Sequence, residues 1–144
     1  MSELREARID DAAEIARLAG ELGYPVAVDT MHARLCALLS MPQHRIVVAQ
    51  GERDELLGWI AVERRLTLES GERIEIVGLV VDAAARGKGV GRALVADAEG
   101  WASAQGFGAI GVRSNVMREG SHPFYESLGY LRVKTQHMYR KALA

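Results

Sequence analysis

The sequence is poor in the features that mark secreted or membrane-spanning proteins. Its 144 residues include a single cysteine, Cys36, which excludes an internal disulfide and agrees with a reducing cytoplasm. No apolar run approaches the roughly 20 residues that a membrane-spanning helix needs, and the first residues lack the apolar core of a signal peptide. We therefore expect a cytoplasmic protein with no membrane partner.

Neither sign of charge dominates the chain. There are 18 Lys and Arg residues against 19 Asp and Glu residues, for a net charge of −1, and no long basic block. This balance does not favour a nucleic-acid partner. The dispersed histidines lack metal-ligand spacing, so we expect no metal site. A content of 49% hydrophobic and 26% charged residues is ordinary for a globular protein, and the length predicts one domain over residues 3–144.

The hydrophobic periodicity changes several times along the chain and predicts alternating helices and strands. The expected elements are a strand over 4–9, helices over 12–22 and 30–39, strands over 45–49, 56–64 and 73–81, a helix over 90–105, a strand over 109–113, a short helix over 122–128 and one or two closing strands over 130–140. Asp11 and Glu14 have the spacing of a capping box at the start of the first helix.

This element order predicts an α+β fold. Short polar connections between the strands of the middle of the chain favour an antiparallel meander. The strand, crossover helix and strand that follow imply one parallel pair. We expect a mixed, mostly antiparallel sheet of about six to seven strands flanked by about four helices.

The most distinctive segment is Arg86-Gly87-Lys88-Gly89-Val90-Gly91-Arg92, between an apolar strand and an amphipathic helix. Alternate glycines let the backbone turn tightly and let a ligand approach main-chain N–H groups. The start of a helix adds unpaired N–H groups and the positive end of the helix dipole. This combination predicts a phosphate-binding loop, and a tight turn without a ligand is the simpler alternative.

Two common phosphate-binding patterns do not fit the glycine loop. A nucleoside triphosphate loop needs Ser or Thr after its lysine, and Lys88 is followed by Gly89. A dinucleotide fold needs an acidic residue about 20 positions downstream, where this chain has Gly111-Val112-Arg113. The remaining pattern is Arg86-x-x-Gly89-x-Gly91.

That pattern resembles the signature of the GNAT superfamily of N-acetyltransferases. A second segment supports the resemblance, since Asn115 is followed by Phe124-Tyr125-Glu126-Ser127-Leu128-Gly129-Tyr130, as in the family. The element order also matches, so the resemblance covers essentially the whole chain. It implies a GNAT-like fold and acetyl-coenzyme A as the acetyl donor, and many members form homodimers through their sheet edges.

The resemblance also implies which residues bind the coenzyme. The backbone amides of residues 86–92 would hold the pyrophosphate, and the main chain of Leu79, Val80 and Val81 would pair with the pantetheine amides. Asn115 would hydrogen-bond the coenzyme or a water chain. The side chains of Arg86, Lys88 and Arg92 either touch phosphate or are solvated.

Acetyl transfer to an amine needs a base, because an ammonium group has no lone pair. Glu75 is the candidate base: it interrupts the apolar run 74–81, and regular alternation places it on one face with Val77 and Leu79. Partial desolvation makes a carboxylate more basic. A strand-edge glutamate that faces solvent, or one that binds the substrate cation, is the alternative.

Tyr125 is the candidate acid for the leaving thiolate, as the resemblance implies, and a core tyrosine is the alternative. The acceptor amine is expected to contact Tyr24, Arg113 or His122. The residues around Asn115 and Tyr125 look most like those of aminoalkylphosphonate N-acetyltransferases, although ten residues separate the two, more than in many members.

The sequence thus predicts direct acetyl transfer to a primary amine, such as an aminophosphonate, an amino sugar or a polyamine. Direct transfer is favoured because no cysteine stands near the motifs to form an acyl intermediate. A coenzyme A-binding regulatory module without catalysis and a protein or peptide N-acetyltransferase are the alternatives.

Overall fold

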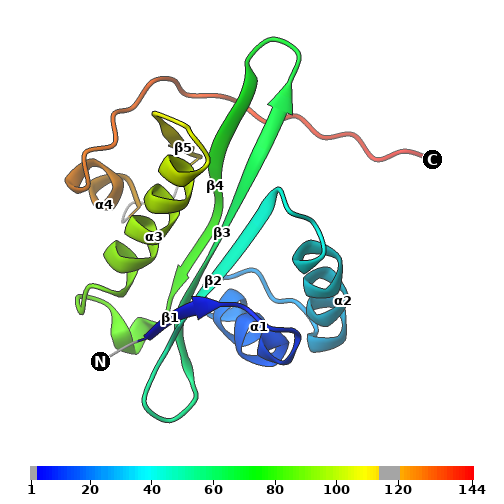
Figure 1. Cartoon of the computed structure of the whole chain (residues 1–144). Coiled ribbons are helices and arrows are strands. Elements are labelled where there is room, and N and C mark those ends of the chain that lie inside the picture. The colour runs from blue at the N-terminus through cyan, green and yellow to red at the C-terminus, as the bar shows by residue number, and fades with distance from the viewer. Residues whose placement is uncertain (1–2, 114–120) are drawn as a thin grey trace. The chain divides into compact units, whose positions relative to one another are not determined.

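The computed structural model describes residues 3–113 and 121–144, apart from the side chains of residues 121 and 122. The chain divides into two compact units, residues 1–113 and 114–144, which are described separately. The N-terminal unit contains, in chain order, β1 (Glu3–Glu6), the 3-10 helix η1 (Ile9–Asp11), α1 (Ala12–Glu21), α2 (Val28–Leu39), β2 (His44–Gln50), β3 (Leu56–Thr67), β4 (Gly71–Val81), the 3-10 helix η2 (Ala83–Ala85), α3 (Val90–Ala104) and β5 (Ile110–Val112) (Figure 1).

The five strands form one sheet in the order β1-β2-β3-β4-β5. The first four strands are antiparallel neighbours, and β5 runs parallel to β4. The parallel pair follows from the crossover through α3, as the sequence predicts. The mixed α+β class is therefore confirmed, and five strands rather than six to seven lie in the described part of the chain.

Helices cover both faces of this sheet. In α1, apolar residues recur at helical spacing and are buried, whereas Glu14 and Arg17 lie on the opposite side of the helix. The α1 and α2 side chains pack with Val48, Leu56 and Val80 in one cluster. On the other face, Val90 and Leu94 of α3 lie against Gly58 of β3. Figure 1 shows α1 and α2 on one side of the strands and α3 on the other.

Two details of the first helices differ from the prediction. Asp11 is the N-cap of α1 but its side chain makes no capping bond, and the Glu14 carboxylate accepts the N–H of Leu56 at 3.0 Å instead. The expected Asp11–Glu14 capping box is therefore wrong, because Glu14 is recruited by a tertiary contact. The position of Cys36 next to the apolar Leu35 in the sequence also favours the core, yet Cys36 is exposed on α2 and its sulfur lies 3.8 Å from Nδ1 of His32.

The C-terminal unit contains α4 (Ser121–Ser127), which is followed by Gly129 in the left-handed conformation, with a φ of +92°. Residues 130–144 form no strand, so the predicted closing strands over 130–140 are wrong. Alternating side chains give the period of a strand, but a strand also needs a hydrogen-bonded neighbour. This segment has no ladder partner among the described residues. No helix in the described ranges is long and apolar enough to cross a membrane.

Candidate active site

A β-bulge interrupts β4 at Val77. Ala61 of β3 pairs with Gly78, and the next residue of β3, Val62, pairs with Ile76. Val77 therefore has no partner across β3 and its side chain is exposed. The bulge coincides with the end of β4–β5 pairing, whose last pair is Ile76 with Val112.

Beyond the bulge, β4 has a free edge. It continues to Val81, while β5 ends at Val112, so no described strand pairs with residues 77–81 on that side. An unpaired strand edge presents N–H and C=O groups that an extended, amide-containing ligand can join. This edge includes Leu79, Val80 and Val81, the residues from which the sequence predicts coenzyme contacts.

The glycine loop follows this edge. Gly87 and Gly89 have φ values of +79° and +83°, in the region that favours glycine. Gly89 is the N-cap of α3, and its carbonyl accepts the first helical bond from the Ala93 N–H at 3.0 Å. The N–H groups of residues 90–92 therefore precede the first intrahelical bond, at the positive end of the helix dipole. The loop has the backbone geometry of an anion site.

The three cationic side chains of the loop, Arg86, Lys88 and Arg92, are exposed. None of them forms an ion pair with another described residue. Their charges are thus available to a phosphate, which adds a long-range attraction to the backbone contacts.

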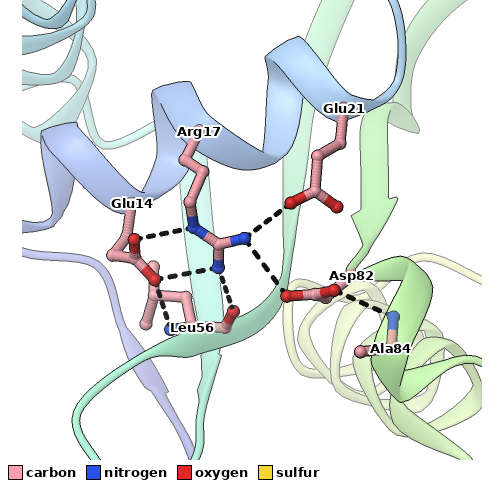
Figure 2. Close-up of polar contacts among 6 residues, drawn as sticks. All are labelled: Glu14, Arg17, Glu21, Leu56, Asp82 and Ala84. Atoms are coloured by element: carbon pink, nitrogen blue, oxygen red, sulfur yellow. Dashed lines mark hydrogen bonds and ion pairs between the residues drawn. The ribbon is translucent and has the colours of Figure 1, made fainter.

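An arginine on α1 joins several elements next to the loop. Figure 2 shows the Arg17 guanidinium between Glu14, Glu21 and Asp82. Arg17 donates to Glu14 at 2.8 Å, to Glu21 at 2.6 Å and to the carbonyl of Leu56 at 3.1 Å. The hydrogen bond from Arg17 lowers the pKa of Glu14, against the opposing effect of burial.

The same guanidinium reaches the end of β4. Arg17 donates to Oδ2 of Asp82 at 3.2 Å, while Oδ1 of Asp82 accepts the N–H of Ala84 at 2.9 Å and caps η2 (Figure 2). Since η2 leads directly into the glycine loop, Asp82 ties the entry of the loop to α1.

Glu75 is buried, with 6% of its surface exposed, and three arginines surround it. Nε of Arg73 lies 2.8 Å from Oε1 of Glu75. Nη1 of Arg65 and Nε of Arg113 lie 3.6 Å and 3.7 Å from Oε2 of Glu75. The expected burial of this carboxylate is confirmed. Its ion pairs link β3, β4 and the residue after β5.

The predicted alternation along β4 is wrong across the bulge. Glu75 pairs with Glu63 and Gly78 pairs with Ala61, so Glu75 and Gly78 share a face, whereas Leu79 lies on the other. The extra residue, Val77, reverses the alternation, as a one-residue shift must. Glu75 therefore shares the face covered by α1 and α2, not that of α3.

The remaining predicted residues are scattered. Tyr24 follows α1 and is exposed. Tyr125 lies on α4 in the C-terminal unit, with its ring centroid 5.2 Å from that of Phe124 and 5.7 Å from that of Tyr130. Asn115 and the His122 side chain lie outside the described residues.

Sequence reasoning missed the bulge and the partners of Glu75. Glycine inside a strand pattern often marks a bulge, so Gly78 carried a usable signal. Arg65 and Arg73 flank the β3–β4 turn at positions that pair across it, which a hairpin register would have shown. No sequence pattern indicates the contact between Arg17 and Asp82, because the two residues are far apart in sequence.

Two shallow hollows in the N-terminal unit lie elsewhere. One of about 470 Å³ is lined by Arg64, Glu72 and Gln105 among others, and one of about 320 Å³ lies between the end of α3 and β5. Neither includes Glu75 or a residue of the glycine loop. No group of three His, Cys, Asp or Glu residues in the described ranges has metal-binding geometry.

Comparison with protein families gives a match over most of the chain. The model described as "Acetyltransferase (GNAT) family" matches residues 10–130. An uncharacterized N-acetyltransferase of Bacillus subtilis (strain 168), YhdJ, is 27% identical over 122 residues, which cover 84% of this chain and 85% of that protein.

Solved structures give the same fold. A protein from Bacillus halodurans C-125 titled a transcriptional regulator is 24% identical, with a TM-score of 0.84 over 98% of this chain and 100% of that chain. An aminoglycoside N-acetyltransferase in complex with CoA is 17% identical, with a TM-score of 0.87 over 99% of this chain and 96% of that chain.

Proposed function

Since the chain belongs to the GNAT acetyltransferase family, we propose that it transfers the acetyl group of acetyl-coenzyme A directly to a primary amine of a small molecule. The observation that carries the proposal is the bulge at Val77, where the pairing of β4 with β5 ends. From there the free edge of β4 leads toward the glycine loop. A ligand with amides at one end and phosphates at the other suits this order of groups.

The residues of the N-terminal unit fit coenzyme A. The free edge of Leu79, Val80 and Val81 would pair with the pantetheine amides, and the N–H groups of the glycine loop, residues 86–92, would hold the pyrophosphate. A Cβ added to Gly87 or Gly89 would meet no heavy atom within 4 Å, so the loop has open space for the phosphates. When bound, acetyl-coenzyme A supplies an activated acetyl thioester. We assign Asn115 to the same site.

Glu75 is our candidate base. One of its carboxylate oxygens would take a proton from the acceptor ammonium, directly or through one water, so that the neutral amine can react. Its burial keeps bulk water away, and its position next to the last β4–β5 pair puts it where the two strands part.

Tyr125 is our candidate acid, whose hydroxyl would return a proton to the leaving sulfur. Tyr125→Phe removes only this hydroxyl and keeps the ring contacts with Phe124 and Tyr130. The acid role requires a kcat lower by roughly 100-fold or more with an unchanged KM for acetyl-coenzyme A. An unchanged rate across pH would remove Tyr125 from the chemistry.

Direct transfer needs no acyl-enzyme. A cysteine thiolate is one nucleophile that forms such an intermediate, and the single cysteine, Cys36, lies exposed on α2 beside His32, away from the glycine loop in the sequence. We therefore expect Cys36→Ser to retain full activity.

The experiment that tests the function follows thiol release from acetyl-coenzyme A with a panel of small amines and with lysine-containing peptides. Turnover on small amines supports the proposal. Tight coenzyme binding with no turnover on any amine would instead support a regulatory module, and turnover on peptides alone would support a protein acetyltransferase.

Two wider proposals accompany this one. We propose that residues 3–144 act as one acetyltransferase domain in the cytoplasm, with neither a membrane nor a nucleic-acid partner. A homodimer is expected from the family alone, and sedimentation at micromolar concentration would test it.

A further inference from the structure

The charged cluster around Glu75 has more donors than the described residues accept from. Three arginines, Arg65, Arg73 and Arg113, lie within 4 Å of a carboxylate that has only two oxygens. Each guanidinium carries five N–H donors. The contacts of Arg65 and Arg113 with Glu75, at 3.6 and 3.7 Å, are ion pairs too long for hydrogen bonds.

The closest contact is also incomplete. Nε of Arg73 is buried and 2.8 Å from Oε1 of Glu75, yet its N–H is not aligned with any acceptor among the described residues. A buried donor without an aligned acceptor is costly in a protein interior. The side chains of Arg65 and Arg113 are partly exposed, so it is their remaining N–H groups that can reach a ligand.

The charges around Glu75 do not cancel. The nearest charged groups on the described strands beside the cluster are Glu63, directly opposite Glu75, and His44, which lies 3.9 Å from Glu63. Three guanidiniums against two carboxylates leave a surplus of one positive charge among these arginine and glutamate side chains. Arg65 and Arg73 also face each other directly across the β3–β4 ladder, and like charges in that position destabilise a sheet. The shared Glu75 carboxylate offsets this repulsion.

The cluster lies where an acceptor must approach. Glu75 directly precedes the last β4–β5 pair, and Arg113 directly follows it. This is the point from which the free β4 edge runs toward the glycine loop. If the proposed function holds, an amine that reaches the acetyl group at Glu75 brings the rest of its structure among the three arginines.

We propose that Arg65, Arg73 and Arg113 bind an oxyanion of the acceptor, so that the substrate is an amine that also carries a carboxylate or a phosphonate. Guanidinium forks match both groups with paired hydrogen bonds. A polyamine or an aminoglycoside brings further positive charges to a face that already has a positive surplus. The proposal rests on the acetyltransferase function proposed above and specifies its substrate class.

The test compares β-alanine, 2-aminoethylphosphonate and propylamine, which are amines of similar length and different charge, with the longer polyamine spermidine. We expect kcat/KM for one or both acid-bearing amines to exceed that for propylamine by roughly tenfold or more, as expected for charge-assisted hydrogen bonds. The two acids distinguish a carboxylate site from a phosphonate site. A preference for propylamine or spermidine would overturn the proposal.

Variants identify the residues responsible. Arg113→Gln and Arg65→Gln are preferred to changes at Arg73, whose Nε is buried next to Glu75. Each should raise KM for the preferred acid about tenfold, change KM for propylamine by a clearly smaller factor, and leave KM for acetyl-coenzyme A nearly unchanged. Arg53→Gln, in the exposed β2–β3 turn, is the control and should change none of these. Equal losses with the acid and with propylamine would contradict an oxyanion site.

A binding measurement separates the two proposals. If no amine is acetylated, the proposed function fails, and the same two acids are titrated calorimetrically onto the coenzyme A-loaded protein. Binding that weakens in Arg113→Gln and not in Arg53→Gln then supports the oxyanion site, and absence of binding overturns it.

Discussion

Glu75 has two roles in this structure that a loss of activity alone would not separate. It is the candidate base, and it is also the common counter-ion of Arg65, Arg73 and Arg113. Removing its charge would leave these three guanidiniums without the carboxylate that they share. Its substitution must therefore be judged by rate, coenzyme affinity and stability together.

We predict that Glu75→Gln lowers kcat by about 100-fold or more, because a general base contributes roughly that factor. The KM for acetyl-coenzyme A should stay unchanged, since Glu75 does not lie on the free β4 edge. The free energy of unfolding should fall by about 1–3 kcal/mol, as for a hydrogen-bonding group lost among charged partners. Steady-state kinetics and thermal unfolding measure both effects.

Glu72→Gln is the matched control, three residues earlier on β4. Glu72 pairs with Arg64 at the surface, so its loss should change kcat less than twofold, as for an exposed ion pair outside the site. A Glu75→Gln variant as active as Glu72→Gln would exclude Glu75 as the base and leave it the role of arginine counter-ion.

Single residues differed in how well the sequence revealed them. Glu75 was found because a charge interrupts an apolar run, and its burial is confirmed. Arg65 and Arg73 were not, because charges on a long hairpin are usual and only the register pairs them. The pairing register of β3 and β4 brings both arginines to Glu75, and this register cannot be deduced from a single sequence.

Among the elements, the glycine loop combines the two devices on which coenzyme binding depends in our proposal. The left-handed backbone conformation of Gly87 and Gly89 sets the turn of the loop, and the start of α3 supplies N–H groups that have no intrahelical partner. The conformation, not the space around it, requires glycine here, since a Cβ at either position would meet no heavy atom within 4 Å.

We predict that Gly89→Ala weakens coenzyme A binding by about tenfold, because a left-handed alanine costs roughly 1–2 kcal/mol. Gly100→Ala, in the middle of α3 and also without a heavy atom within 4 Å, should stabilise the protein by about 0.5–1 kcal/mol and leave the affinity unchanged. Calorimetric titration and thermal unfolding of the two variants test this contrast. Equal coenzyme affinities would show that the backbone of the loop does not hold the phosphates.

The link from α1 to the loop gives a second prediction at this scale. Arg17→Gln removes the bonds to Glu14 and Asp82 (Figure 2), so η2 loses its tie to α1. We expect a roughly three- to tenfold weaker binding of coenzyme A, the loss of one charged hydrogen bond, and a lower Tm.

Glu21→Gln serves as the comparison, because it removes one surface bond of Arg17 and keeps the bond to Asp82. Its coenzyme affinity should equal that of the unchanged protein. Asp82→Asn should reproduce the weaker binding, and in the double variant with Arg17→Gln the two effects should not add. Additive effects would show that Arg17 stabilises α1 without acting on the loop.

For the elements, the sequence predicted the order and type of the four α-helices and five strands of the described residues from their hydrophobic periods, but not the short 3-10 helices η1 and η2. The prediction was wrong for β4, where the bulge at Val77 reverses the alternation of side chains. It was also wrong for the start of the first helix, where the Glu14 carboxylate accepts the N–H of Leu56 instead of forming a capping box. Both errors have the same origin. Local pattern rules assume that a residue's partners are its neighbours in sequence.

For the whole molecule, the composition and element order predicted the α+β class and the one parallel strand pair. They did not predict that residues 130–144 lack a ladder partner in the described part of the chain. Side-chain alternation is a local property, whereas strand pairing is decided by the rest of the molecule.

The stability of the molecule should depend on pH through carboxylates tied to arginines. Burial raises the pKa of Asp11, but hydrogen bonds from Arg5 and from the Arg8 N–H outweigh it, so the pKa is lowered from 3.8. The Arg17 hydrogen bond lowers the pKa of Glu14 from 4.5, against burial. In both cases the unfolded chain binds a proton more readily than the folded one. Their stabilisation is therefore complete above the ordinary pKa values and is lost as pH falls through the lowered ones.

We predict that Tm is steady from about pH 7 to pH 5 and falls between about pH 5 and pH 3, where these carboxylates take up protons. Glu14→Gln should lower Tm at pH 7 and make Tm decrease less steeply between about pH 5 and pH 3, because the uncharged amide is a weaker partner of Arg17 at every pH. Glu69→Gln, in the exposed β3–β4 turn, should follow the unchanged protein. Calorimetric scans at several pH values measure the slopes. A Glu14→Gln variant whose Tm falls as steeply as that of Glu69→Gln would show that acid destabilises the protein by protonating other carboxylates. The contacts of Arg17 would then contribute to coenzyme binding without contributing to the stability of the fold in acid.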